Sequence, residues 1–163
     1  MGPLLTLLKT FGNLCLLRAN PQDLPAAPVL TVVTLLAYTL VSVGLSLPDL
    51  GLGRAALWAV LDTGVLAILT HSALLLRRFP ERFYQTLAAL MGSGALLGLL
   101  AWPIVAMQNV TAQIVMLVWN LAVVAHILRH ALSVPLALGI LASLGYFMAE
   151  LLLSLAFMVP AAN

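Results

Sequence analysis

Residues 28–47, PVLTVVTLLAYTLVSVGLSL, contain no charged side chain. A helix of ~20 apolar residues is long enough to cross the hydrocarbon core of a bilayer. Four further long apolar stretches follow, at residues 55–76, 85–107, 111–132 and 135–159. Together these stretches predict an all-α fold, a polytopic membrane bundle of five transmembrane helices that forms one domain over residues 28–163.

The composition excludes most classes of soluble protein. Hydrophobic residues make up 63% and charged residues 7% of the 163 positions, and the mean hydropathy is +1.14. A water-soluble domain needs far more polar surface. The predicted spans leave no room for a soluble catalytic domain, and the seven Lys and Arg residues are too dispersed for a nucleic-acid footprint. The sequence therefore predicts a protein of the lipid bilayer that is not an enzyme and binds no nucleic acid.

Residues 1–27 are predicted to form a separate N-terminal segment. Apolar residues recur at helical spacing between Leu4 and Leu17, whereas Lys9 falls elsewhere on the helical wheel. This pattern is typical of an interfacial amphipathic helix. The proline-rich run at residues 21–28 then predicts an extended approach to the first span, because a residue before proline avoids helical angles.

The distribution of cations predicts the orientation of the bundle. Short cytoplasmic loops carry an excess of Lys and Arg. With the N-terminus in the cytoplasm, Arg54 alone lies outside, and six cations lie inside: Lys9, Arg18, Arg77, Arg78, Arg82 and Arg129. Five spans then place the C-terminus outside, and the pattern is typical of a bacterial inner-membrane protein.

Three polar side chains fall well inside predicted spans. At a rise of ~1.5 Å per residue, Asp62 lies roughly 10 Å from the outer end of its span, and Asn120 and Glu150 roughly 13 Å. These side chains are expected to share one buried polar layer in the outer half of the bundle. Tyr146, one turn from Glu150, and Ser93, at a similar depth, are candidate members of the same layer.

The two acids of this layer have two possible roles. An ionised carboxylate costs at least a few kcal/mol at such depth, and no Lys or Arg is predicted nearby, so the neutral forms are favoured. One interpretation is a proton or cation relay through Asp62 and Glu150. The other is a hydrogen-bonded clasp that fixes the register of the helices. The clasp is preferred, because two carboxylates without an inward chain of acceptors make a poor relay.

Small residues predict where helices pack closely. Gly94 and Gly98 are four apart on the third span, and Gly139 and Ser143 are four apart on the fifth. Small residues at this spacing let the backbones of membrane helices approach each other. Contacts within the bundle are the simpler expectation, and a dedicated dimer motif is the alternative.

Three histidines lie toward the predicted inner side. His126 and His130 are four apart and share a helical face, and His71 lies near the cytoplasmic end of the second span. A metal ion or a haem could be held by such side chains from two helices. Ordinary interfacial chemistry beside Arg129 is the competing explanation, and it is preferred. The expectation is therefore that the protein has no cofactor, with metal or haem as the alternative.

The layout resembles the Yip-domain membrane proteins, particularly the short bacterial members. The similarity rests on residues 20–28, which lead into the first span, and on residues 117–132, which carry Trp119 and Asn120 and lead into the last span. Family resemblance implies a non-enzymatic membrane protein that acts through partner proteins or lipids. The longer soluble N-terminal region of the eukaryotic relatives is missing here, so a trafficking role does not carry over.

The sequence favours a function by association. The expected role is an accessory subunit, scaffold or assembly factor of a membrane complex, with other membrane proteins or further copies of this chain as partners. A small proton-coupled channel or carrier that uses Asp62 and Glu150 is the first alternative. A redox subunit that binds metal or haem through the three histidines is the second.

Overall fold

The computed structural model describes residues 3–158, and its secondary structure in that range is entirely helical. The predicted all-α fold class is therefore confirmed. The end of the fifth span at residue 159, the C-terminus and the first two residues of the N-terminal segment lie outside the described range. The elements, in chain order, are α1 (Pro3–Cys15), η1 (Pro21–Asp23), α2 (Pro28–Leu76), η2 (Pro80–Arg82), α3 (Phe83–Ala106), α4 (Val110–Ala131) and α5 (Leu136–Met158).

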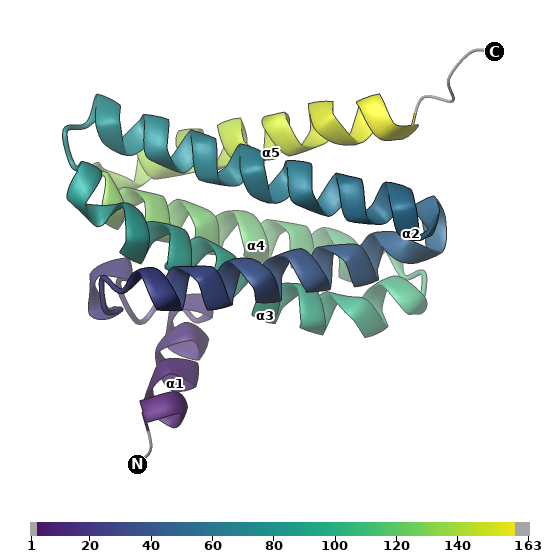
Figure 1. The fold of residues 1–163 in the computed structure, drawn as a ribbon, viewed down its shortest axis with the longest axis horizontal. Helices are drawn as coiled ribbons and strands as arrows, with labels where there is room; N and C mark the ends of the chain where they lie inside the picture. Colours follow the sequence, from purple (N-terminus) through teal and green to yellow (C-terminus); the bar gives the residue numbers. More distant parts are fainter. Residues whose placement is uncertain (1–2, 159–163) are drawn as a thin grey trace.

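Four of these helices, α2 to α5, are long and apolar enough to cross a membrane. Within the described residues this makes the chain a polytopic helical membrane protein. Helix α2 has 49 residues, which at ~1.5 Å per residue is more than twice the ~30 Å of a hydrocarbon core. It therefore cannot be a single straight crossing, and Figure 1 shows that it folds back on itself.

The fold in α2 occurs at Gly51, where φ is 71° and ψ is 163°. A positive φ of this kind is open to glycine and costly for residues with a Cβ. The first two spans were predicted as residues 28–47 and 55–76, but α2 continues through Pro48, and the only interruption between the two arms is the break at Gly51. The two arms of α2 run antiparallel in Figure 1, and the Thr39 and Thr63 hydroxyls join them by a hydrogen bond of 2.9 Å.

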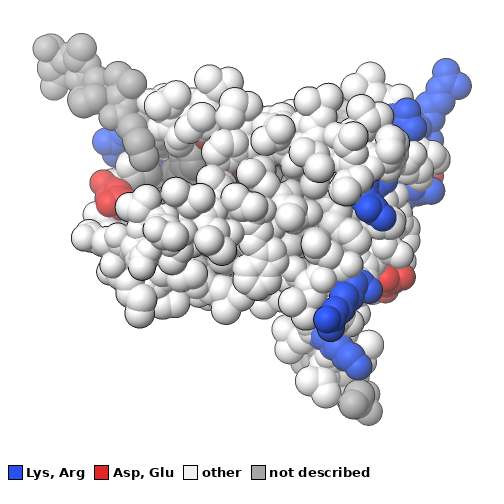
Figure 2. Space-filling view, turned by 180° about the vertical axis from the view of Figure 1, so that it is seen from behind, with Lys and Arg blue, Asp and Glu red and all other residues white. Residues whose placement is uncertain are grey.

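The bundle has two chemically different ends. The Gly51 end contains the α2 fold and the connection between α3 and α4, and it carries Asp49 and Arg54. The basic end contains the connections that carry Arg77, Arg78 and Arg82. Figure 2 shows Lys and Arg gathered at one end and on the projecting helix, with an uncharged band between the two ends.

Two arginines at the basic end cap helix α4. The last carbonyls of a helix have no partner within the helix. Arg82 donates to the Ala131 carbonyl at 3.0 Å and to the Ser133 hydroxyl at 2.8 Å, and Arg77 donates to the Leu132 carbonyl at 3.3 Å. The positive charges also oppose the negative end of the helix dipole. These contacts tie the α2–α3 connection to the end of α4.

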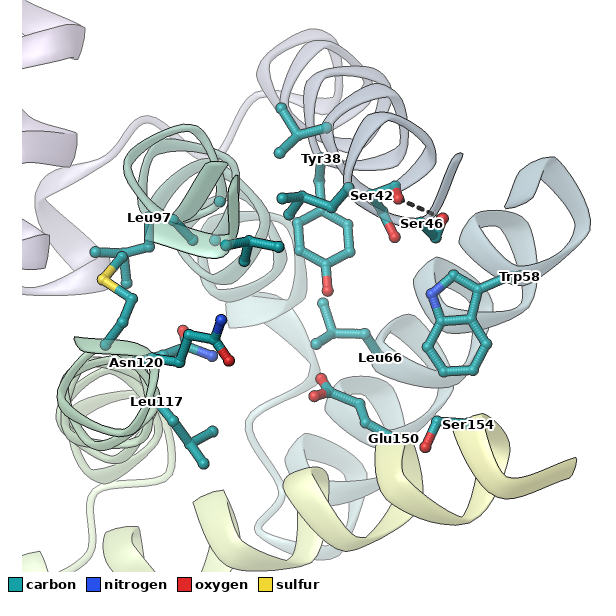
Figure 3. Close-up of a pocket in the computed structure, with 18 of the residues that line it drawn as sticks. Tyr38, Ser42, Ser46, Trp58, Leu66, Leu97, Leu117, Asn120, Glu150 and Ser154 are labelled. Atoms are coloured by element: carbon teal, nitrogen blue, oxygen red, sulfur yellow. Dashed lines mark hydrogen bonds between the residues drawn. The ribbon is translucent and has the colours of Figure 1, made fainter. Parts of the chain in front are cut away.

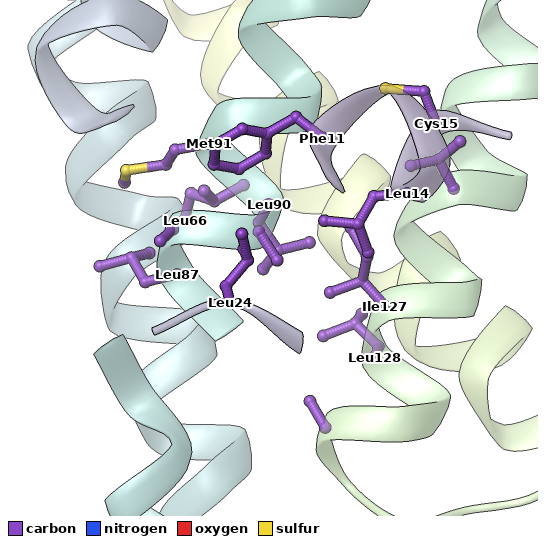
Figure 4. Close-up of a cluster of buried hydrophobic side chains, with 14 of the residues drawn as sticks. Phe11, Leu14, Cys15, Leu24, Leu66, Leu87, Leu90, Met91, Ile127 and Leu128 are labelled. Atoms are coloured by element: carbon purple, nitrogen blue, oxygen red, sulfur yellow. The ribbon is translucent and has the colours of Figure 1, made fainter. Parts of the chain in front are cut away.

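Helix α1 lies at a steep angle to the long helices and projects from one side of the bundle (Figure 1). Its C-terminal half is docked on α3 and α4, where Phe11, Leu14 and Cys15 join the buried apolar cluster drawn in Figure 4. The expected interfacial helix is thus in large part a packed element of the fold. The Phe11 ring occupies the space where a Cβ on Gly92 would lie.

The segment that follows α1 is held by side chains of the bundle. Trp119 donates to the Cys15 carbonyl at 2.8 Å, and the His126 ring nitrogen lies 2.9 Å from the Ala19 carbonyl. Gln85 donates to the Leu24 carbonyl at 2.8 Å. Such bonds are strongly favoured in a water-poor surrounding, because an unpaired backbone carbonyl there costs several kcal/mol.

Glycines set the spacing of the long helices. A Cβ on Gly94 would lie 2.8 Å from the Tyr38 ring, and one on Gly98 would lie 2.6 Å from Val41. These two glycines of α3 therefore admit large side chains from the first arm of α2. Gly139 on α5 faces the Ala125 carbonyl oxygen, which would lie 2.7 Å from its Cβ. Ser143, one turn further on, is buried and donates to the Ile140 carbonyl.

Candidate functional site

A cavity of about 530 Å³ lies among all four long helices. It extends from Asp49 and Gln113, near the Gly51 end, to Leu66 and Leu90 in the interior of the bundle. Most of its wall is apolar, but polar side chains from three helices also line it. We call this space the polar cavity. Its polar lining residues are Tyr38, Ser42, Ser46, Asp49, Gln113, Asn120, Glu150 and Ser154.

Glu150 and Asn120 reach this space from different helices. Figure 3 shows the Glu150 carboxyl of α5 and the Asn120 amide of α4 directed into the cavity, with the Tyr38 hydroxyl on the opposite side. Glu150 sits more than two turns before the last described residue of α5, Met158. Placing an acid so far inside an apolar helix is costly unless a partner or a ligand offsets the charge.

Asp62 lies behind the cavity wall. Its side chain is only 5% exposed, and it is not one of the lining residues. On the second arm of α2, Asp62 shares a helical face with Trp58 and Leu66, which do line the cavity. Asp62 is therefore a buried acid beside the cavity, whereas Glu150 is an acid that enters it.

The polar cavity is closed toward the basic end. Leu66 and Leu90 belong both to its lining and to the buried apolar cluster. One to two turns further along, Leu74, Leu87 and Ile127 are each at most 3% exposed. Close-packed side chains of this kind leave little space for water, and Thr70 and Tyr146, two polar residues buried at this level, bond to each other. The cavity thus occupies the half of the bundle next to the Gly51 end and does not extend to the basic end.

The remaining members of the predicted polar layer lie elsewhere. Tyr146 is buried and donates to the Thr70 hydroxyl at 3.3 Å, and it borders a pocket of only about 20 Å³ beside Asn120 and Glu150. Ser93 donates to the Ala89 carbonyl within its own helix and does not line the cavity. The structure therefore gathers Asp62, Asn120 and Glu150 around one space and leaves Ser93 outside it.

Tyr38 and Ser42 were not singled out from the sequence. They are spaced four apart on the first arm of α2 and therefore share a helical face. A hydroxyl pair on one face of an apolar helix is a weak signal, because Thr and Ser commonly bond to their own backbone. Thr34 and Ser46 of the same helix do this.

The three histidines do not form a common site. The His126 and His130 rings lie close, with centroids 4.7 Å apart, whereas His71 is exposed and packs edge-on against Phe83. Arg129 donates to His130 at 3.2 Å. Among residues 3–158, no group of three His, Cys, Asp or Glu side chains is arranged to hold a metal ion. His71 packs against Phe83 of α3 and not against the His126–His130 pair, and the metal or haem alternative stays a prediction.

No family model, curated protein or solved structure matches this chain. The resemblance to Yip-domain proteins accordingly stays a prediction. The geometry of the polar cavity is the remaining guide to function.

Proposed function

We propose that the chain crosses the membrane five times, with the two arms of α2 as separate spans. Each arm has the length of one crossing, and the fold at Gly51 reverses the chain between them. The excess of arginine at the basic end supports an orientation in which this end and the N-terminus face the cytoplasm. The Gly51 end, with the mouth of the polar cavity, then faces outward. A bacterial inner membrane remains our proposed location.

This topology predicts opposite reactivities for two single-cysteine variants made in a Cys15→Ser background. Leu52→Cys lies at the Gly51 end and Glu81→Cys at the basic end, and both positions are exposed. In intact cells, a membrane-impermeant maleimide is expected to label Leu52→Cys, and to label Glu81→Cys only after permeabilisation. Labelling of both, or of Glu81→Cys alone, contradicts the proposed orientation.

We propose that the protein binds a small molecule in the polar cavity, from the outer side of the membrane. The observation that carries this proposal is a space of about 530 Å³ into which Glu150 and Asn120 point. Ligand cavities typically measure ~300–1,000 Å³ and are mostly apolar with a few convergent polar groups. A role by association, which the sequence favours, accounts for the acids as a clasp between helices but gives no reason for a space of this size.

The shape of the cavity argues for binding rather than for an open channel. Between Glu150 and the basic end, the interior is filled mainly by the apolar cluster around Leu87 and Ile127, and the Tyr146–Thr70 pair is buried within it. A channel needs a continuous polar or hydrated route. The proton-coupled alternative therefore requires a carrier that changes conformation, with ligand binding at Glu150 as its first step. Whether the protein only binds its ligand or also carries it, the ligand first occupies the polar cavity.

Access to the cavity is tested by cysteine labelling at depth. Asn120→Cys in the Cys15→Ser background is expected to react with an impermeant maleimide from the outer side, because Asn120 lines the cavity. The matched control is Ala89→Cys, a small side chain with 0% exposure in the apolar cluster, which is expected to stay unlabelled. If Asn120→Cys is as unreactive as Ala89→Cys in folded protein, the cavity is not accessible and the proposal fails.

A further inference from the structure

The charged side chains that line the polar cavity are both acidic. Glu150 and Asp49 line it and Asp62 lies behind its wall, whereas no Lys, Arg or His side chain is among its lining residues in the described part of the chain. Arg54 does not line the cavity, and its guanidinium is held at the rim by the carbonyl of Phe157, a lining residue. Between the two ends of the bundle, Asp62 and Glu150 are the charged residues of the long helices.

A positively charged ligand would be favoured in the polar cavity. An ionised Glu150 is costly inside the bundle, because no Lys, Arg or His side chain lines the cavity to pair with it. A cation beside Glu150 would offset this cost, because attraction between opposite charges is strong where water is excluded. An anion in the same space would instead place a second negative charge beside the carboxylate. We therefore expect the cavity to bind cationic ligands in preference to anionic ones.

Aromatic side chains add a second feature that suits a cation. Trp58 and Tyr38 line the cavity together with Glu150, and Figure 3 shows both rings facing the same space. The Trp58 ring is held edge-on against Phe157, with centroids 5.6 Å apart. Aromatic faces attract ammonium and other organic cations, most strongly where the site is desolvated. The cavity thus combines a carboxyl with two aromatic rings, groups that suit an organic cation.

The rest of the wall determines what surrounds that positive group. Val41, Leu45, Leu97, Ile104 and Leu117 give the cavity a mainly apolar lining. A small hydrated metal ion would leave this surface uncovered, whereas an organic cation with apolar substituents would cover it and gain hydrophobic contact. The volume is in the range that accepts such a molecule.

From these observations, and given the ligand-binding role proposed above, we propose that the polar cavity selects lipophilic organic cations, such as amines or quaternary ions with apolar substituents, with Glu150 as the charge partner and Trp58 and Tyr38 as aromatic contacts. Asp62 strengthens the negative potential from behind the wall. Asn120 supplies a hydrogen bond to occupants that carry an N–H donor.

The test uses two probes of nearly the same size and shape but opposite charge. The purified full chain in dodecyl maltoside is dialysed to equilibrium against tetraphenylphosphonium or tetraphenylborate. Saturable binding of the phosphonium is expected, and no saturable binding of the borate. Glu150→Gln is expected to weaken phosphonium binding at least about tenfold, and Trp58→Leu by several-fold, since desolvated cation–π contacts are strong.

The control is Glu81→Gln, which removes the same charge from the exposed basic end and is expected to bind like the unmodified chain. Asp62→Asn serves as a second cavity variant if Glu150→Gln elutes abnormally on size exclusion. Equal binding of both ions, or unchanged phosphonium affinity in folded Glu150→Gln or Asp62→Asn, overturns the inference. If Asn120→Cys is labelled while the phosphonium does not bind, the charge selectivity fails but the accessible cavity stands.

Discussion

Gly92→Val is expected to release helix α1 from the bundle and to expose Cys15, the single cysteine of the chain. The Phe11 ring lies where the new side chain would be placed, so the two cannot coexist without movement. Overpacking of this kind typically costs about 1–3 kcal/mol, which corresponds to a shift of roughly 5- to 150-fold in a two-state population. The docked helix is the element that can move at the lowest cost.

The readout is the rate at which Cys15 reacts with a maleimide. Cys15 is 6% exposed, and burial raises the pKa of its thiol above the usual value. Both effects slow the reaction, because the accessible thiolate is the nucleophile. Release of α1 restores access and lowers the pKa toward its ordinary value, so both changes speed labelling. We expect the rate in Gly92→Val to rise by the same 5- to 150-fold or so.

Gly12→Val on α1 is the matched control for this substitution. No atom lies within 4 Å of the position that its Cβ would occupy, so labelling of Cys15 is expected to stay slow. If Gly92→Val reacts no faster than Gly12→Val while both remain folded, α1 is not held at Gly92. Rapid labelling of the unmodified chain would show that α1 does not stay docked.

Gly139→Leu is expected to be the most destabilising single change in the α4–α5 pair. A Cβ at Gly139 would lie 2.7 Å from the Ala125 carbonyl oxygen and 2.8 Å from the Arg129 Cβ. The carbonyl belongs to the α4 backbone and cannot rotate aside, so the two helices must separate. We expect a loss of about 1–3 kcal/mol or more, and each kcal/mol lowers Tm by about 2–4 °C in a chain of this size.

The comparison variant is Gly145→Leu on the same helix. Gly145 is exposed, and nothing lies within 4 Å of its Cβ position. A surface change of this kind usually alters stability by about 0.5 kcal/mol or less. The Tm of each variant can be followed by size exclusion after heating in detergent. Equal melting of the two variants would contradict the close approach of α4 and α5 at Gly139.

Part of the candidate site could be predicted from the sequence. Three polar residues within apolar spans were recognised directly, Asp62, Asn120 and Glu150. Counting residues from the span ends predicted similar depths for them. Ser93 was grouped with them by depth alone, yet it does not line the cavity. Depth is set by position along one helix, whereas the direction of a side chain depends on how that helix is rotated against its neighbours.

The positions of the histidines also show that contacts between helices cannot be predicted from spacing along the sequence. Four-residue spacing brought His126 and His130 together as expected. His71 pairs instead with Phe83 on α3, because contacts between helices, and not spacing within one helix, decide which residues meet. The docking of α1 was missed for a related reason: its amphipathic pattern suits a lipid interface and a protein groove equally well.

By itself, the sequence determined that this chain is a helical protein of the lipid bilayer and where its long apolar stretches lie. Those properties depend on the transfer of local stretches of chain from water to lipid, and they need no knowledge of neighbouring helices. The tertiary structure alone decided that Tyr38 and Trp58 face Glu150 across one cavity and that Phe11 occupies the space beside Gly92. Such contacts arise from the packing of helices whose outer surfaces are almost equally apolar, so hydrophobicity cannot rank their arrangements and the fit of individual side chains must do so.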